Sequence, residues 1–241
     1  MKKIAFIPAR YAATRFPGKL MQKIGDQTII SMVYRNAVDM KLFDDVVVVT
    51  DSDIISDEIK KSGGTVVKSI KPHESGSDRI AEACEHMDVD IVVNIQGDEP
   101  FIKKQPLEDL INSFEEPRVA VASLMQKYPE NESYENSNIV KVVCNKFNDA
   151  LYFSRSMIPY KRNKEAKEVL YRHIGVYAYR KKTLLDFTTW PMGVLEKMEM
   201  LEQLRYLENG ISIRMIETNE ASVGIDSPED LKKAIAFYNK Q

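Results

Sequence analysis

The sequence predicts an α/β protein with a single-domain, Rossmann-like, mostly parallel sheet and helices on both faces. In the first hundred residues, short runs of β-branched residues alternate with stretches of helical periodicity. This β-α-β order gives parallel strands joined by right-handed crossovers. In the second half, several strand-like runs follow one another directly, which predicts an antiparallel excursion. No linker rich in Pro, Gly or Ser interrupts the chain, so we expect one domain over residues 1–241.

The elements of the first half follow from simple patterns. Asp45–Thr50 contains four consecutive valines, as expected for a strand buried on both faces. Ser52–Ser62 has helical periodicity and is followed by Gly63-Gly64, a helix stop. The other elements predicted here are the strands Lys3–Ile7, Thr65–Lys68 and Asp90–Asn94 and the helices Thr28–Lys41 and Ser77–Met87.

The second half is less regular. Val194–Asn209 predicts one long helix ended by Gly210, and Pro228–Tyr238 predicts a closing helix capped by Asp226 or Ser227. The remaining predicted elements are a helix at Lys104–Phe114 and strands at Val119–Leu124, Ile139–Cys144, Ala150–Phe153, His173–Tyr179 and Ile211–Ile216.

The composition excludes several classes of protein. The 241 residues carry a formal net charge of −2, so bulk charge indicates neither nucleic acid nor membrane as a partner. No stretch approaches the ~20 apolar residues that span a bilayer. Cys84 and Cys144 match neither a disulfide framework nor a zinc motif. We therefore expect two buried thiols and a cytoplasmic location.

The loop after the first strand carries three cations, Arg10, Arg15 and Lys19. In open α/β sheets, ligands bind beyond the carboxyl ends of the strands. The loop is not a P-loop, because it lacks the leading Gly and has Leu20 where Ser or Thr would bind magnesium. It fits a cradle for a polyphosphate, and the alternative is a solvated basic loop.

Two aspartates occupy similar places. Asp98 lies in the stretch QGDEP, directly after the buried strand DIVVN, and Asp226 lies between a short apolar run and the last helix. Each could hold Mg²⁺, which is usually bound by one or two carboxylates together with substrate phosphates. The alternative for both is a cap on the following turn or helix.

Ser75-Gly76-Ser77 opens a predicted helix and offers amides and hydroxyls to an anion or a base edge. A helix cap is the alternative, although Ser77 is followed three residues later by Ile80 and not by an acid.

Strand Arg172–Tyr179 alternates, with His173, Gly175, Tyr177 and Tyr179 on one face. This face could line a polar cavity or be half solvated. Glu202 falls on an apolar-leaning face of its predicted helix and needs a partner. The residues alone favour an ion pair with Arg205 over contact with a hydroxyl-rich ligand.

Taken together, these stretches resemble the 3-deoxy-manno-octulosonate cytidylyltransferase (CMP-Kdo synthetase) family. The matching segments, in order, are IPARYAATRFPGK, HESGSDRIAEA, VVNIQGDEP, ALYFSRSMIPY, YRHIGVYAYR, LEKMEMLEQLR and VGIDSPEDL. Two departures are Ser77, where the family usually has Thr, and Met192-Gly193-Val194, where we expect a Ser-Pro-type helix entry.

The resemblance implies transfer of a cytidylyl group from CTP to an eight-carbon ulosonic acid, with release of pyrophosphate, for lipopolysaccharide biosynthesis. Residues 1–125 would mainly bind CTP, and residues 126–220 would mainly bind the sugar and form a homodimer. The implied nucleotide-binding residues are Pro8, Ala9, Arg10, Arg15, Lys19, Ser75, Gly76 and Arg79. The implied catalytic residues are Arg10, Lys19, Asp98 and Asp226, of which Asp98 and Asp226 bind Mg²⁺. The implied sugar-binding residues are Gln96, Arg155, His173, Tyr177, Glu202 and Gln203.

Two other functions fit the same residues. One keeps the CTP chemistry but accepts a related acid, either an 8-amino sugar or a sialic-acid-like one. The other is a nucleotide-binding regulator without turnover. Lys19, Asp98 and Asp226 together argue against the regulator, because a binder would not need both carboxylates.

Overall fold

The computed structural model describes residues 1–12, 16–71, 73, 75–129, 132–163, 165, 169–220 and 224–240. The chain divides into two compact units. The first comprises Met1–Lys104 and Ala221–Gln241, and the second comprises Gln105–Glu220. Each is described by itself below. The α/β fold class is confirmed, and the assignment of all 241 residues to one domain stays a prediction.

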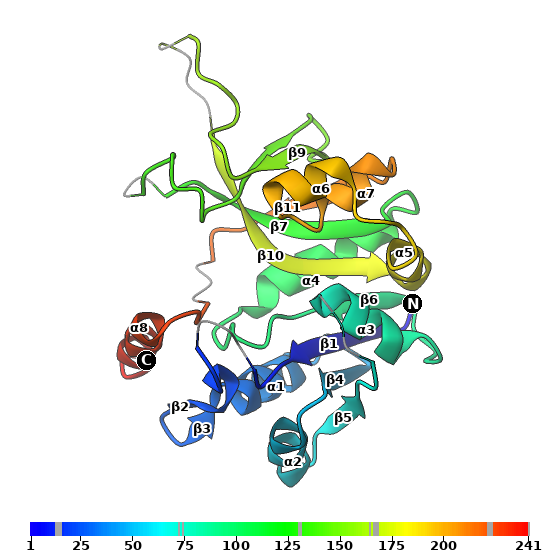
Figure 1. Ribbon diagram of the computed structural model, residues 1–241, viewed down its shortest axis with the longest axis vertical. Helices are drawn as coiled ribbons and strands as arrows, with labels where there is room; N and C mark the ends of the chain where they lie inside the picture. Colours follow the sequence, from blue (N-terminus) through cyan, green and yellow to red (C-terminus); the bar gives the residue numbers. More distant parts are fainter. Residues whose placement is uncertain are drawn as a thin grey trace. The chain divides into compact units, whose positions relative to one another are not determined.

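The sheet of the first unit is parallel. Strand β1 (Lys3–Ala9) pairs with β4 (Asp45–Thr50) on one side and with β6 (Ile91–Asn94) on the other, and β4 pairs with β5 (Thr65–Lys68) (Figure 1). The valines of β4 are almost completely buried, as their run predicts. The order β5-β4-β1-β6 reverses direction between β1 and β6. In such sheets the crevice at this reversal binds ligands.

Three helices connect these strands. They are α1 (Ile29–Asp39), α2 (Asp53–Lys61) and α3 (Gly76–Cys84), and each begins after a hydroxyl residue whose side chain accepts a backbone N–H of the first turn. Right-handed crossovers place α1 and α2 on one face of the sheet and α3 on the other. The predicted start of α3 at Ser77 is wrong, because Ser75 is the N-cap and Asp78 takes the acidic position three residues later.

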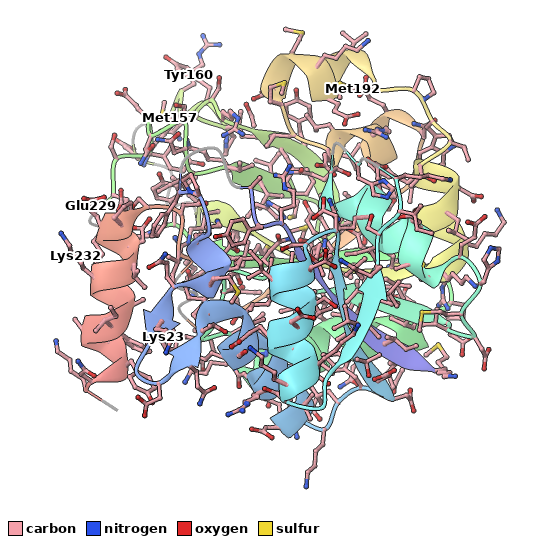
Figure 2. The ribbon with its side chains drawn as sticks, turned by 60° about the horizontal axis from the view of Figure 1, so that its bottom comes forward. Lys23, Met157, Tyr160, Met192, Glu229 and Lys232 are labelled. Atoms are coloured by element: carbon pink, nitrogen blue, oxygen red, sulfur yellow. The ribbon has the colours of Figure 1, made fainter. Side chains whose placement is uncertain are left out.

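The last helix, α8 (Pro228–Tyr238), has the predicted bounds. Ser227 forms a capping box with Asp230, so the cap is Ser227 and not Asp226. Helix α8 lies beside the short strand β2 (Lys23–Ile24), which pairs with β3 (Gln27–Thr28). Figure 2 shows Lys23 on this hairpin and Glu229 and Lys232 on α8.

The second unit contains the antiparallel excursion. Strand β7 (Val121–Lys127) pairs in parallel with β11 (Ile213–Glu217) and antiparallel with β10 (Tyr171–Arg180). Strand β8 (Lys141–Cys144) pairs antiparallel with both β10 and β9 (Ala150–Ser154). The register of β10 against β7 shifts between Ile174 and Tyr177. Such a bulge re-aims the side chains around it.

The helices of this part are α4 (Lys104–Asn112), with a 3₁₀ turn at Ser113–Glu115, α5 (Lys181–Phe187), α6 (Val194–Glu199) and α7 (Leu204–Glu208). The prediction of one helix over Val194–Asn209 is wrong. Met200 adopts a left-handed conformation with φ of 52° and ends α6. Among the described residues, none of the helices combines the length and the apolar character needed to cross a lipid bilayer.

The departure at Gly193 has a structural reason. The carboxylate of Glu208 accepts hydrogen bonds from the backbone N–H groups of Leu195 (3.0 Å) and Glu196 (3.3 Å), at the start of α6. A Cβ on Gly193 would lie 2.0 Å from Oε2 of Glu208. The start of α6 is thus capped from α7, and only glycine leaves room for that carboxylate.

Candidate active site

A cavity of about 320 Å³ lies at the carboxyl ends of β1 and β6, at the reversal in strand order. It brings together many of the predicted site residues. Those that line it are Pro8, Arg10, Lys19, Ser75, Gly76, Arg79, Gln96, Asp98 and Asp226. Phe16, Leu20 and Gly97, which the sequence did not single out for binding, also line it. Its volume is in the range of small-molecule sites.

Lys19 joins the two predicted metal carboxylates. Its Nζ donates to Oδ2 of Asp98 at 2.5 Å, to Oδ1 of Asp226 at 3.0 Å and to the carbonyl oxygen of Ile225 at 3.1 Å. Burial lowers the pKa of Lys19, but the two carboxylates raise it more, so the net shift is upward. The lysine therefore stays charged, and one cation already bridges Asp98 and Asp226.

The backbone around Lys19 explains its placement. Gly18 has a φ of 67°, where a side chain would be strained, and its N–H donates to the carbonyl of Tyr11 at 3.0 Å. Lys19 then opens a 3₁₀ turn, Lys19–Met21. Opposite, a Cβ on Gly97 would lie 3.1 Å from the carbonyl oxygen of Pro8, so this glycine permits the close approach of the β1 and β6 loops.

Arg79 lies on the cavity wall. It is 3% exposed, and its Nη2 donates to Oδ2 of Asp51 at 3.0 Å. Its Nη1 is buried away from solvent and has no hydrogen-bond partner among the residues that the structure describes, although buried guanidinium donors are normally satisfied. Arg79 therefore supports the cavity wall through its contact with Asp51.

The remaining predicted nucleotide-binding residues differ in how accessible they are to a ligand. The Ser75 hydroxyl donates to the Asp78 carboxylate at 2.8 Å and accepts from the Asp78 N–H at 3.1 Å, so capping already uses it. Arg10 is exposed on the lining, and Ala9 is buried as the last residue of β1. Arg15 lies outside the described residues.

Of the predicted sugar residues, Gln96 belongs to the first unit and the other five to the second. His173 and Tyr177 lie on β10 with ring centroids 5.3 Å apart. Burial lowers the pKa of His173 to about 3 and raises that of Tyr177 well above its ordinary value. His173 is therefore a neutral imidazole at any physiological pH.

Ser123 on β7 forms a hydrogen bond with His173. Its Oγ lies 2.9 Å from Nε2 of His173, 2.9 Å from the Val176 carbonyl oxygen and 3.2 Å from that of Ile174. The hydroxyl has a single proton, so it donates to only one of these acceptors at a time, and its oxygen accepts from Nε2–H in the tautomer that carries the proton on Nε2. The bulge in β10 thus presents two carbonyls to Ser123.

The His/Tyr face of β10 packs against other rings. His173 contacts Phe153 at 5.1 Å between centroids, and Tyr177 stacks on Tyr179 at 5.7 Å. Tyr179 is 2% exposed and continues to Tyr206 at 5.9 Å. This face is therefore buried at Tyr179, whereas His173, Gly175 and Tyr177 are partly exposed, which fits the half-solvated alternative.

Arg205 forms a buried ion pair with Glu196, which the sequence did not predict. Its guanidinium donates two hydrogen bonds to the Glu196 carboxylate of α6, from Nε at 2.7 Å and from Nη2 at 2.6 Å. The guanidinium also lies over the ring of Phe187. The break at Met200 lies between Glu196 and Arg205 and allows these two side chains to meet, while the backbone N–H of Arg205 still donates to the Glu202 carbonyl at 3.0 Å. Glu202 is exposed.

Arg155 and Gln203 lie near this break. The Arg155 guanidinium donates to the carbonyls of Ser137 (3.1 Å), Glu199 (2.8 Å) and Met200 (3.4 Å), and its backbone N–H donates to the Glu199 carboxylate. Gln203 is buried just before α7. Arg155 therefore ties the end of α6 in place.

The model of the family described as "Cytidylyltransferase" matches residues 4–214. The chain belongs to this family. The chain is 56% identical over 240 residues to the 3-deoxy-manno-octulosonate cytidylyltransferase of Flavobacterium johnsoniae, and the alignment covers 98% of each chain. It is 44% identical over 251 residues to the protein of the same name from Bacteroides thetaiotaomicron, covering both completely.

Solved structures agree with these relatives. A CMP:2-keto-3-deoxy-manno-octonic acid synthetase in complex with CTP matches this cytidylyltransferase-family chain with a TM-score of 0.95 and 38% identity, covering 100% of this chain and 99% of the other. The resemblance to 3-deoxy-manno-octulosonate cytidylyltransferases that the sequence motifs indicate is therefore confirmed.

Sequence reasoning missed residues whose role depends on distant partners. Asp51, directly after β4, orients Arg79 on α3, and Ser123 on β7 orients His173 on the neighbouring strand β10. Lys141 is fully buried and donates to the carbonyls of Asn136 (2.7 Å) and Arg155 (3.0 Å). Burial lowers the pKa of Lys141. In the sequence it is an ordinary lysine at a strand start, without a signal that predicts burial.

Proposed function

We propose that this chain transfers the cytidylyl group of CTP to 3-deoxy-D-manno-octulosonate (Kdo), giving CMP-Kdo and pyrophosphate for lipopolysaccharide biosynthesis. The observation that carries the proposal is the cavity at the β1–β6 reversal, where Lys19, Asp98 and Asp226 converge. Relatives 41–56% identical, of matching length, carry the name of this activity.

The reaction is a displacement at phosphorus. The anomeric hydroxyl oxygen of the sugar forms a bond to the α-phosphorus. The bond from that phosphorus to the oxygen that bridges it to the β-phosphorus breaks, pyrophosphate leaves with the electron pair, and the hydroxyl proton passes to solvent water. Such chemistry needs positioning and charge neutralisation more than a covalent nucleophile. Arg10, Arg15 and Lys19 bind the phosphates, and Arg79 supports the wall of the nucleotide pocket.

Asp98 and Asp226 are the carboxylates that would hold Mg²⁺. Both reach one ammonium group in this structure, so both can reach one cation. Within the described part of the chain, no group of three or more His, Cys, Asp or Glu residues suits a metal. Two carboxylates are the number expected when substrate phosphates supply other ligands. Bound Mg²⁺ would neutralise phosphate charge and acidify the sugar hydroxyl.

The sugar acid is bound by Gln96, Arg155, His173, Tyr177, Glu202 and Gln203. His173 is neutral, so it orients a hydroxyl and does not supply a charge. Glu202 is exposed and is therefore accessible to sugar hydroxyls. Arg155 supplies the cation for the carboxylate if it exchanges one of its carbonyl partners.

The active protein is a cytoplasmic homodimer built from the second half of the chain. The exposed apolar side chains of that half support the dimer, among them Leu151, Met157, Tyr160 and Val169. Figure 2 shows Met157 and Tyr160 at the surface. Sedimentation of the purified chain tests this, and a monomer at micromolar concentration would contradict it.

Pyrophosphate release tests the function. The protein is mixed with CTP, Mg²⁺ and a panel of acids comprising Kdo, 8-amino-Kdo and a sialic acid. We expect release with Kdo at a kcat/KM at least tenfold above that of either other acid. Faster turnover of another acid would identify a related cytidylyltransferase. Binding of CTP without release from any acid would indicate a nucleotide-binding regulator.

A further inference from the structure

The segment between β5 and α3 leads directly to the nucleotide cavity. Its last residue, Ser75, and the first residue of α3, Gly76, both line that cavity. A Cβ on Gly76 would lie 3.4 Å from Cγ of Pro8, so this wall packs closely against the end of β1. The position of the segment therefore sets part of the cavity wall.

One carboxylate accepts hydrogen bonds from most of the described part of this segment. Oε2 of Glu82, on α3, accepts hydrogen bonds from the Ser69 hydroxyl (2.9 Å), the Ile70 N–H (3.3 Å) and Nε2 of His73 (2.7 Å). Oε1 accepts from the Lys71 N–H at 3.3 Å. A single side chain thus replaces the pairing that a strand or helix would supply.

In the described part of the segment, apolar packing contributes little. Ile70 is 89% exposed, so its side chain contributes nothing to a core. In contrast, the side chains of Glu82 and His73 are 18% and 10% exposed. Burial acts to raise the pKa of Glu82, but the hydrogen bonds from His73, Ser69 and the Lys71 N–H lower it, and the net shift is downward. The charged carboxylate is the form that fits this arrangement.

We propose that Glu82 is a positioning residue for the nucleotide: by binding Ser69, Ile70, Lys71 and His73, it holds Ser75 and Gly76 in the cavity wall. Glu82 does not line the cavity, so it acts through the segment and not by touching CTP. This inference rests on the proposed binding of CTP in this cavity. It adds to that function a residue whose loss weakens nucleotide binding specifically.

The test compares Glu82→Ala and Glu82→Gln with Glu85→Gln, a matched control on an exposed position of the same part of the chain. CTP affinity is measured directly by calorimetry without the sugar, and KM is measured for CTP and for Kdo. We expect Glu82→Ala to weaken CTP binding about tenfold and Glu82→Gln about threefold, because the amide keeps one acceptor oxygen. The KM for Kdo should stay within twofold, and Glu85→Gln should match the wild type.

A purely structural role gives a different result. In that case the Glu82 variants have a lower Tm but unchanged CTP affinity, and the proposal is overturned. Equal increases in KM for both substrates would overturn it as well. If Glu82→Ala does not fold, Glu82→Gln and Ser69→Ala, which removes one donor, decide the matter by the same criteria. Failure of the wild-type protein to bind CTP at all would instead contradict the proposed function.

Discussion

The ion pair between Arg205 and Glu196 makes a strong prediction about stability. Glu196 is 2% exposed and Arg205 is 9% exposed, and two short hydrogen bonds join them. In Glu196→Gln, one oxygen of the side chain is replaced by an NH₂ group that faces a guanidinium donor, and the buried cation loses the negative charge of Glu196. Two further acceptors near Arg205 are the carbonyls of Phe187 and Trp190, both at 3.5 Å.

Removing one partner of a buried pair costs about 3–5 kcal/mol. Since the amide keeps one acceptor, we expect the lower end, about 3 kcal/mol. For a chain of this length, 1 kcal/mol corresponds to about 2–4 °C in Tm, which gives a decrease of roughly 6–12 °C. Glu202→Gln, at an exposed position six residues later, is the matched control and should leave Tm unchanged.

Thermal and urea denaturation of the two variants provide the measurement. A Tm for Glu196→Gln within 2 °C of the wild type would refute the reasoning, as would an equal loss in Glu202→Gln. Steady-state kinetics add a second distinction. Glu202→Gln should raise the KM for the sugar with little change for CTP, because its proposed role is in binding and not in packing.

Three further predictions follow from single groups. Asp98→Asn should lower kcat at least a hundredfold while CTP still binds weakly, since it removes one of two carboxylates that reach the same cation, and a near-normal kcat would refute the metal role. His173 has a folded pKa of about 3 against about 6.5 when unfolded, so below pH 6.5 the unfolded state takes up a proton that the folded state excludes, and stability falls by up to about 1.4 kcal/mol per pH unit. His173→Gln should flatten this slope in urea titrations at pH 5 and 7.5, and identical slopes would contradict it. Burial raises the pKa of Cys144 to about 11, so a thiol-specific disulfide reagent at pH 8 should label it at least a hundredfold more slowly in the native protein than in urea.

Local pattern predicted most of the first unit. Strands β4 and β5 and helix α8 have the predicted bounds, because valine runs, glycine stops and a Pro-initiated helix act within a few residues. The cavity was also predictable, since the connections after β1 and β6 leave the sheet on opposite faces where the strand order reverses, and a crevice opens between them. Lys19, Asp98 and Asp226 were each recognised from their place after a strand or before a helix.

The second unit shows where local pattern fails. Nothing in the sequence near Met200 stops a helix, but distant Arg155 donates to the carbonyls of Glu199 and Met200 where the chain turns. That turn changes which residues share a helix face, and Arg205 therefore meets Glu196. Lys141 is similar, because its burial depends on carbonyls and rings from other segments. Contacts of this kind depend on tertiary structure and not on periodicity.

The row of stacked rings in the second unit also supplies an optical probe. Trp190 is the only tryptophan of the chain, and its ring lies 6.1 Å from that of Tyr206 and 6.3 Å from that of Phe187. Its fluorescence reports solely on residues 105–220, whereas circular dichroism averages over the whole chain. Coincident melting curves from the two signals would mean that both units unfold as one cooperative block, and separate curves would mean two domains.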